Sequence, residues 1–136
     1  MMNIQFNMAF LRRVALVFVV SAFFANIFAI TARPQQRPEL RCGWFVNPTP
    51  ANAWLIDRER EWIIAVQGGY QADGDWPDFK PSQWIETNGH YGYGCACMKV
   101  NANRAEEKIV SIISAYAKPL SACRKDKAIR NKEPGE

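Results

Sequence analysis

The residues best suited to chemistry in this sequence lie between Asn88 and Cys97. This stretch holds the chain's single histidine, His90, and two of its four cysteines, Cys95 and Cys97. Imidazole and thiolate are ligands that zinc prefers, and a histidine beside a cysteine can activate it as a nucleophile. Zinc sites usually present cysteines two to four residues apart in a turn, whereas these two alternate with a single alanine in a strand-like run. The spacing therefore argues against a metal site.

A regular strand would also keep His90 away from Cys95. Successive side chains of a strand point to opposite faces, so these two are expected on opposite faces of the sheet. A single histidine beside a turn is more often a surface or packing residue than a catalytic one. Gly89, Gly92 and Gly94 lie within the same strand and do not open a helix, as a dinucleotide fingerprint requires. We therefore assign no catalytic residue, no metal ligand and no cofactor.

A cluster of carboxylates precedes this stretch, at Asp73, Asp75 and Asp78. It lacks the twelve-residue spacing and the terminal glutamate of helix–loop–helix calcium sites, so we expect a polar turn. Trp76 lies among these carboxylates and is the tryptophan that we expect to be exposed. An exposed aromatic ring beside carboxylates and amides is typical of a contact point for a sugar or a protein.

Three segments, 47–52, 67–76 and 88–91, combine amides, glycines and aromatic rings without apolar periodicity. Recognition residues tend to lie on such loops when a rigid scaffold positions them. The alternative is that these amides and glycines only satisfy turn geometry. The residues that we predict to bind a partner are Asn47, Thr49, Asn52, Gln67, Gln71, Trp76, Asn88, His90 and Tyr91.

Strand-like runs surround these segments. The sequence predicts strands over 42–46, 54–57, 62–67, 84–87 and 90–100. The second and third are joined by four charged residues, 58–61, which read as a hairpin turn. Asn88-Gly89 is expected to be the two-residue turn of the last hairpin, which would place Thr87 opposite His90 and Trp84 opposite Tyr93.

The segment after the last strand changes period. Residues 104–117 carry apolar side chains at helical spacing, and Asn103 with Glu106 resembles a capping box. We expect this helix, or a large side chain, to cover the face of the last strand that Gly92 and Gly94 leave bare. The predicted fold is α+β: a small antiparallel sheet of four to five strands with one C-terminal helix packed on a face, and two disulfides.

The four cysteines predict two disulfides, provided that the chain is exported. Cys95 and Cys97 would lie about 6.6 Å apart along a strand, too far for the roughly 3.8 Å that bridged Cβ atoms need. Two pairings remain: Cys42–Cys95 with Cys97–Cys123, or Cys42–Cys97 with Cys95–Cys123. The sequence does not choose between them.

The first 32 residues have the composition of a secretory signal peptide. Arg12 and Arg13 precede the apolar run 14–25, and small residues follow. We predict cleavage after Ala32, with Ala29 as a second site. The alternative is a retained anchor, which would be the chain's only contact with a membrane. The predicted location is the periplasm or the cell exterior.

The rest of the chain divides into three parts. They are a leader at 33–40, a disulfide-stapled domain at 41–124 and a basic flexible tail at 125–136. The chain has 17 basic and 13 acidic residues, a net charge of +4. The basic residues form no stripe and concentrate near the end, so nucleic acid is not an expected partner.

Several motifs follow one another in a characteristic order, at 41–44, 47–52, 57–58, 67–72 and 87–97. Together they resemble DUF4087, a family of small exported bacterial proteins of unknown function. The resemblance runs from about Arg41 to Cys123. It implies a bacterial source and export, and it supplies no catalytic residues.

The favoured function is that of a non-enzymatic exported envelope protein that binds another protein or a cell-wall glycan. The alternative is a small periplasmic hydrolase that uses His90 or the loop carboxylates. No nucleophile–base pair can be read from the spacing, and the histidine has no evident orienting partner.

Overall fold

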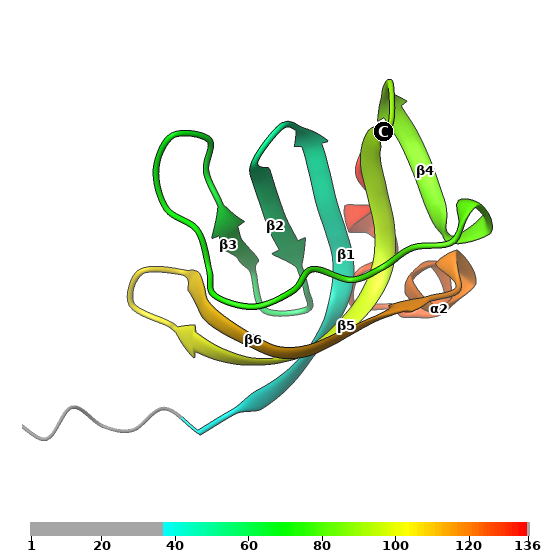
Figure 1. Ribbon diagram of the computed structural model, residues 1–136. Helices are drawn as coiled ribbons and strands as arrows, with labels where there is room; N and C mark the ends of the chain where they lie inside the picture. The colour runs from blue at the N-terminus through cyan, green and yellow to red at the C-terminus, as the bar shows by residue number, and fades with distance from the viewer. Residues whose placement is uncertain (1–36, 136) are drawn as a thin grey trace, which may run out of the picture. The chain divides into compact units, whose positions relative to one another are not determined.

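The computed structural model describes residues 37–135 of the chain. The predicted signal peptide and residues 33–36 of the leader lie outside the described residues. Within the described part, no helix is long and apolar enough to cross a membrane. Six strands and a short helix are connected by turns (Figure 1): β1 (Glu39–Thr49), β2 (Asn52–Ile56), β3 (Glu61–Ala65), the 3₁₀ turn η1 (Pro81–Gln83), β4 (Trp84–Asn88), β5 (Tyr91–Asn103), β6 (Lys108–Lys118), α2 (Leu120–Lys125) and the 3₁₀ turn η2 (Arg130–Lys132).

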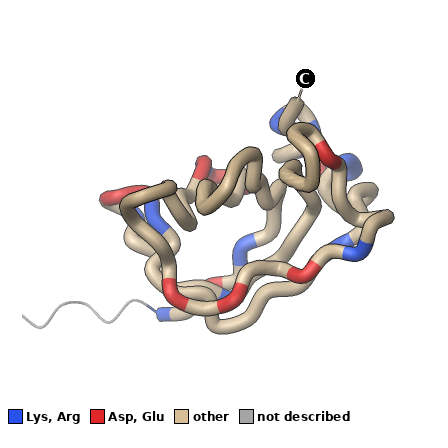
Figure 2. The backbone as a smooth tube through the Cα atoms, turned by 45° about the horizontal axis from the view of Figure 1, so that its top comes forward, with Lys and Arg blue, Asp and Glu red and all other residues tan. Residues whose placement is uncertain are grey.

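Five of the strands close into a ring. β1 pairs with β2 and with β5, β2 pairs with β3, and β6 pairs with β5. A single parallel bridge, between Ile63 and Lys108, closes β3 against β6. The result is a partly open, five-stranded barrel of the kind that includes the OB fold, an architecture that by itself carries no function. β4 extends the sheet beside the first residues of β5. Acidic and basic positions are interspersed along the backbone (Figure 2).

The interior of the barrel is filled by one face of each strand. β5 contributes Ala96, Met98, Val100 and Ala102, which recur with the period of two that a half-buried strand requires. Burying one large aliphatic side chain stabilises a fold by about 1.5–3 kcal/mol. The other buried members of this cluster are Phe45, Ala53, Leu55, Trp62, Ile64, Ala65, Ala72, Ile109 and Ile112.

The outer faces of β1 and β5 carry a second cluster. Trp44, Tyr93 and Cys95 pack there against Cys123 of α2 and against Ile129. The indole Nε1 of Trp44 donates a hydrogen bond to the carbonyl oxygen of Ile129 at 3.0 Å. The segment after α2 is therefore part of the core, and the prediction of a flexible tail from residue 125 is wrong over the residues described.

Both predicted disulfides are present, and the structure chooses between the two pairings that the sequence leaves open. Cys42 bonds Cys97, and Cys95 bonds Cys123. Cys42 and Cys97 lie directly opposite each other on β1 and β5, with Cα atoms 4.0 Å apart. The second bridge attaches α2 to the outer face of β5. A sheet with a C-terminal helix on one face and two disulfides is thus confirmed, although the sheet has six strands and one parallel pair.

The helix predicted over 104–117 is wrong, because residues 108–118 form β6 and the C-terminal helix begins later, at Leu120. The register between β5 and β6 shifts twice, leaving Val110 and Ile113 as extra residues on β6. Each bulge interrupts the period of two, and the one at Val110 places buried Ile109 and Ile112 three residues apart. The run of β-branched residues was the better guide to a strand.

The hairpin of β4 and β5 is present, but its register differs from the predicted one. Asn88 pairs with Tyr91, so the turn is Gly89-His90, and Trp84 pairs with Gly94 instead of Tyr93. A shift of one residue moves every side chain to the other face of a sheet. Trp84 consequently packs against the interior cluster, and its neighbour in β4 joins the outer one.

Candidate functional site

A groove of about 670 Å³ opens where β1, β4 and the segment before β4 meet. Most of its wall consists of aromatic and proline rings, with three polar side chains at its margins. Open, largely apolar concavities with a few convergent polar groups are the usual form of a ligand site. The lining residues are Phe45, Asn47, Trp76, Pro77, Phe79, Pro81, Trp84, Ile85, Glu86 and His90.

Four aromatic rings build the floor of the groove. Phe45 is buried, and the rings of Trp76, Phe79 and Trp84 surround it with centroids at 5.6, 5.7 and 6.4 Å. Phe79 also lies 4.9 Å from Trp84. Such distances are typical of stabilising aromatic pairs. The three outer rings are only partly buried, so each presents some of its surface to a ligand.

Gly94 of β5 makes room for this arrangement. A Cβ atom at this position would lie 2.4 Å from Cε1 of Phe79 and 2.7 Å from the backbone oxygen of Gln83. The expected close approach to the bare face of β5 is therefore confirmed, with Phe79 as the side chain that makes it. The expectation that a helix over 104–117 covers this face is wrong.

The segment that carries the rings is fixed at its start by backbone hydrogen bonds to two strands. The amide of Ala72 donates to the carbonyl oxygen of Ile64 at 2.8 Å. The amide of Asp73 donates to Val110 at 3.1 Å, and the amide of Ile112 donates to Asp73 at 2.7 Å. These bonds attach the chain to β3 and β6 three residues before Trp76. The prediction that Trp76 is exposed is wrong, since its ring is half-buried against Phe45.

The turn between β4 and β5 forms one rim of the groove. The indole Nε1 of Trp84 donates to the carbonyl oxygen of His90 at 3.1 Å, which fixes the turn on the aromatic floor. The imidazole of His90 stacks on the ring of Tyr91 at 4.2 Å. The amide of Asn88 reaches across to the carbonyl oxygen of Pro48 at 3.3 Å, which links this turn to the end of β1.

Five of the predicted binding residues belong to the groove or its rim. Asn47, Trp76 and His90 line it, and Asn88 and Tyr91 contact its rim. The register of the hairpin brings these together with rings that the sequence analysis did not select. The missed lining residues are Phe45, Pro77, Phe79, Pro81, Trp84, Ile85 and Glu86, and the alternation of aromatic and proline residues from 76 to 84 was the signal for most of them.

The other predicted residues lie apart, and the amides around the turn between β1 and β2 hold that turn. Asn52 donates to the hydroxyl of Thr49 at 2.7 Å, and its side-chain oxygen accepts from the amide of Gln67 at 2.9 Å. With its amide nitrogen facing the turn, Asn47 donates to the carbonyl oxygens of Thr49 and Asn52. Gln71 is exposed and bridges Ala65 through its backbone.

Comparison with known proteins places the chain but does not assign an activity. Residues 36–130 match the family described as "Protein of unknown function (DUF4087)", which covers more than half of the sequence. The chain belongs to the DUF4087 family. No curated protein and no solved structure matches it. The function of this DUF4087 protein therefore has to be argued from its own geometry.

A charged cluster occupies the other end of β1. Arg41 forms an ion pair with Asp57, and both residues are buried, at 5% and 2% exposure. The guanidinium carbon of Arg41 lies 3.9 Å from the centroid of Trp62, whose indole Nε1 donates to Asp57 at 3.0 Å. Glu39 and Glu59 also accept hydrogen bonds from the guanidinium, at 2.8 and 3.2 Å.

The charges of this cluster satisfy one another. Arg104 bridges Glu39 and Glu59 from the turn between β5 and β6, at 2.7 Å to each. The hydrogen bond from Arg104 lowers the pKa of Glu59. Burial lowers the pKa of Arg41, but its hydrogen bonds to Glu39 and Asp57 outweigh this effect and hold that pKa above its usual value. Every charge named in this cluster therefore has a partner of opposite charge within the chain.

None of the four cysteines offers a free thiol as a nucleophile or metal ligand, since all four are bonded in pairs. Within residues 37–135, no group of three or more His, Cys, Asp or Glu side chains could hold a metal ion. The groove can therefore provide aromatic surface, a carboxylate, an imidazole and a rim of backbone groups.

Proposed function

We propose that this protein is a non-enzymatic binding module of the bacterial envelope, which holds an extended peptide segment of a partner protein in its aromatic groove. One observation carries the proposal: Trp76, Phe79 and Trp84 are held around the buried ring of Phe45, and each keeps part of its surface open. Grooves lined by aromatic rings are a recurrent way to bind extended peptides.

A peptide suits the groove better than a glycan does. Sugars offer many hydroxyl groups, and a site for them needs a comparable number of polar partners in the wall. Among the described lining residues, Asn47, Glu86 and His90 provide the polar side chains besides the indole N–H groups, and the amide nitrogen of Asn47 is engaged by the turn between β1 and β2. The remaining wall is apolar and would desolvate proline or aliphatic side chains.

The hydrolase alternative receives less support. A hydrolase that uses histidine needs a nucleophile within reach and a third group that orients the imidazole. His90 is exposed at a turn and stacks on Tyr91, and among residues 37–135 no hydrogen bond orients its ring. The carboxylates Asp75 and Asp78 are exposed as well.

The test is selection from a random peptide library on the protein purified from an oxidising compartment. Peptides enriched by the wild type should be lost by Trp76→Ala and retained by Tyr116→Ala. Tyr116 is the matched control, because it is an exposed aromatic residue (46%) on β6, outside the groove. Thermal unfolding of both variants shows whether they are folded.

Three results would overturn the proposal. Enriched peptides that bind wild type and Trp76→Ala equally would place the site elsewhere. If the protein retained a cell-wall glycan and enriched no peptide, the partner would be a glycan and not a protein. Turnover of a cell-wall substrate that disappears in His90→Ala would make the protein an enzyme.

A further inference from the structure

The carboxylates around the groove differ from those in the rest of the described chain. Between residues 66 and 90 there are four, Asp73, Asp75, Asp78 and Glu86, against one lysine, Lys80. Among residues 37–135 none of these four forms an ion pair. The carboxylates elsewhere in this part are nearly all paired, those of Glu39, Asp57, Glu59, Glu106, Glu107, Asp126 and Glu133.

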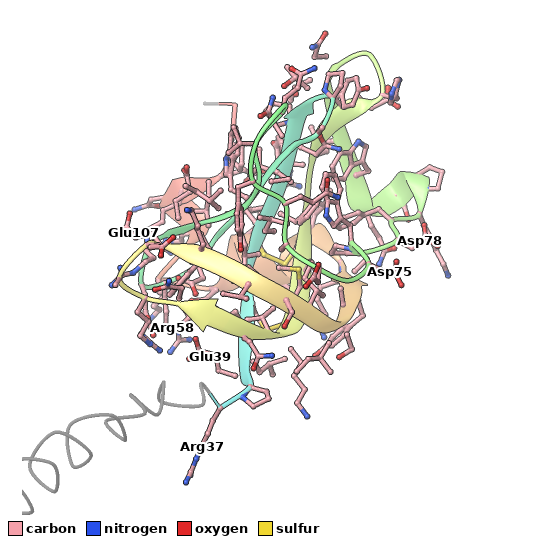
Figure 3. The ribbon with its side chains drawn as sticks, turned by 60° about the vertical axis from the view of Figure 1, so that its left-hand side comes forward. Arg37, Glu39, Arg58, Asp75, Asp78 and Glu107 are labelled. Atoms are coloured by element: carbon pink, nitrogen blue, oxygen red, sulfur yellow. A yellow bond between two sulfur atoms is a disulfide. The ribbon has the colours of Figure 1, made fainter. Side chains whose placement is uncertain are left out.

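One of these unpaired carboxylates lines the groove, and two others are adjacent to groove residues in sequence. Glu86 lines the groove directly, and Asp75 and Asp78 flank Trp76 and Pro77 in sequence. Figure 3 shows Asp75 and Asp78 close together on the segment that leads into β4. The chain as a whole is positively charged, with a net charge of +4. A negative patch on a positive protein attracts a cationic ligand to that patch.

The charged cluster near the start of β1 shows how a cation can contact an aromatic ring and a carboxylate at once. There the guanidinium of Arg41 lies 3.9 Å over the ring of Trp62 and pairs with Asp57. A guanidinium is suited to this position because it stacks on an aromatic face and binds a carboxylate at the same time. The groove offers the same two components: indole rings that are partly exposed, and carboxylates that have no cationic partner among residues 37–135.

On this basis, and resting on the proposed peptide-binding function, we infer that the groove takes a basic, proline-containing segment of a partner protein. An arginine of that segment lies against the ring of Trp76 or Trp84 and pairs with Glu86, Asp75 or Asp78. Proline favours the extended polyproline II conformation, which presents its ring to an aromatic wall and costs little ordering entropy. Lys80 would repel a cationic ligand, but its side chain is exposed to solvent and the segment 66–90 carries four carboxylates against this one lysine.

The experiment compares two synthetic peptides that differ in one charge. One is a proline-rich peptide with a central arginine, and the other carries citrulline in its place, which keeps the shape and removes the charge. Titration followed by tryptophan fluorescence should give about tenfold tighter binding of the arginine peptide. Rising salt should reduce this ratio. The same ratio should fall in a triple variant with Asp75→Asn, Asp78→Asn and Glu86→Gln.

Glu61→Gln is the matched control, because Glu61 is an exposed carboxylate on β3 that lies outside the groove. It should leave the ratio unchanged. Equal binding of the arginine and citrulline peptides would overturn the inference and leave the proposed function standing. Arginine binding that survives in both Trp76→Ala and Trp84→Ala would reduce the effect to surface charge and also overturn it. If neither peptide binds while the library enriches uncharged sequences, the groove binds peptides of another kind and this inference fails alone.

Discussion

β1 connects two regions that use similar chemical groups in different ways. Near its start, Arg41 lies between the ring of Trp62 and the carboxylate of Asp57, and all three are buried. Near its end, Phe45 supports a groove whose other rings are half-open and whose carboxylates have no cationic partner among the described residues. The first region is complete within the chain and serves the fold. The second leaves its rings and carboxylates without partners in the part of the chain that the structure describes, which is why we propose a ligand there.

The comparison shows that a cluster of charged and aromatic residues does not by itself indicate a functional site. The charged cluster contains perturbed groups, such as Glu59, whose pKa is lowered by the hydrogen bond from Arg104. Perturbed ionisable groups occur in structural ion-pair networks as well as in active sites. What separates the two regions is whether the groups that a ligand would contact already have partners.

The largest expected effect is at the charged end. Arg41→Ala should reduce the free energy of unfolding by about 3–5 kcal/mol, because it leaves the buried carboxylate of Asp57 without its partner. Urea unfolding of the oxidised protein measures the loss. Arg58→Ala is the control, since Arg58 follows Asp57 in the turn between β2 and β3, has a 72% exposed side chain and should change stability by no more than about 0.5 kcal/mol. Equal losses in the two variants would mean that the buried cluster does not hold this end together.

The next effect concerns the bridges between β5 and its two neighbours. Replacing Cys42 and Cys97 by alanine, or Cys95 and Cys123, should each cost about 2–5 kcal/mol in urea unfolding. The first pair closes the longer loop, with a separation of 55 residues against 28, so its loss should be larger by roughly 0.6 kcal/mol. Thiol titration of the unfolded wild type before reduction serves as the control and should detect none. Losses below about 1 kcal/mol for both pairs would contradict this account.

A smaller effect is expected at the groove end. Gly94→Ala should cost about 1–3 kcal/mol, because the new methyl group overlaps Phe79 and the backbone oxygen of Gln83. Displacing Phe79 should also weaken peptide binding, which no change in the charged cluster should do. The control is Gly69→Ala, where a Cβ atom would meet only an oxygen at 3.7 Å. Unchanged binding in Gly94→Ala would show that the position of Phe79 does not shape the groove.

Much of the fold could be predicted from local patterns. The alternation along β5 placed Ala96 and Met98 on one face and Cys95 and Cys97 on the other, and the same argument excluded a bridge between Cys95 and Cys97. Bulges could not be predicted. The extra residues Val110 and Ile113 in β6 imitated a helical period, and the irregularity between Glu86 and Asn88 shifted the hairpin register by one residue.

The candidate site was only partly predictable for the same reason. Asn47, Trp76 and His90 were found because loop amides and isolated aromatic residues are a local signal. Trp84 was assigned to the wrong face by the shifted register, so its contact with Phe45 could not be foreseen. The approach of Phe79 to the strand depends on the path of a segment without periodicity, which only tertiary packing determines.

The smallest expected effect concerns the C-terminal segment. It tests whether the contacts of this segment stabilise the fold, as those of the charged cluster do. Glu133 accepts hydrogen bonds from Arg124 at 2.7 Å and from the hydroxyl of Tyr93 at 3.1 Å. The hydrogen bond from Arg124 lowers the pKa of Glu133 below its usual 4.5, although burial opposes the shift. A carboxylate whose pKa is lower in the folded state stabilises the fold fully above its unfolded pKa, and the contribution is lost as pH falls through the lowered pKa.

Glu133→Gln should therefore cost up to about 1 kcal/mol near pH 7, since one partner is half-exposed and the pair is screened by solvent. The difference in unfolding free energy between wild type and variant should shrink as the pH falls below 4.5. The wild-type carboxylate then gains a proton and becomes uncharged, like the glutamine of the variant. Unfolding free energies across this range measure it, with Glu61→Gln as the exposed control. A difference that stays constant with pH would mean that packing around Tyr93, and not the charge of Glu133, attaches the segment to the barrel.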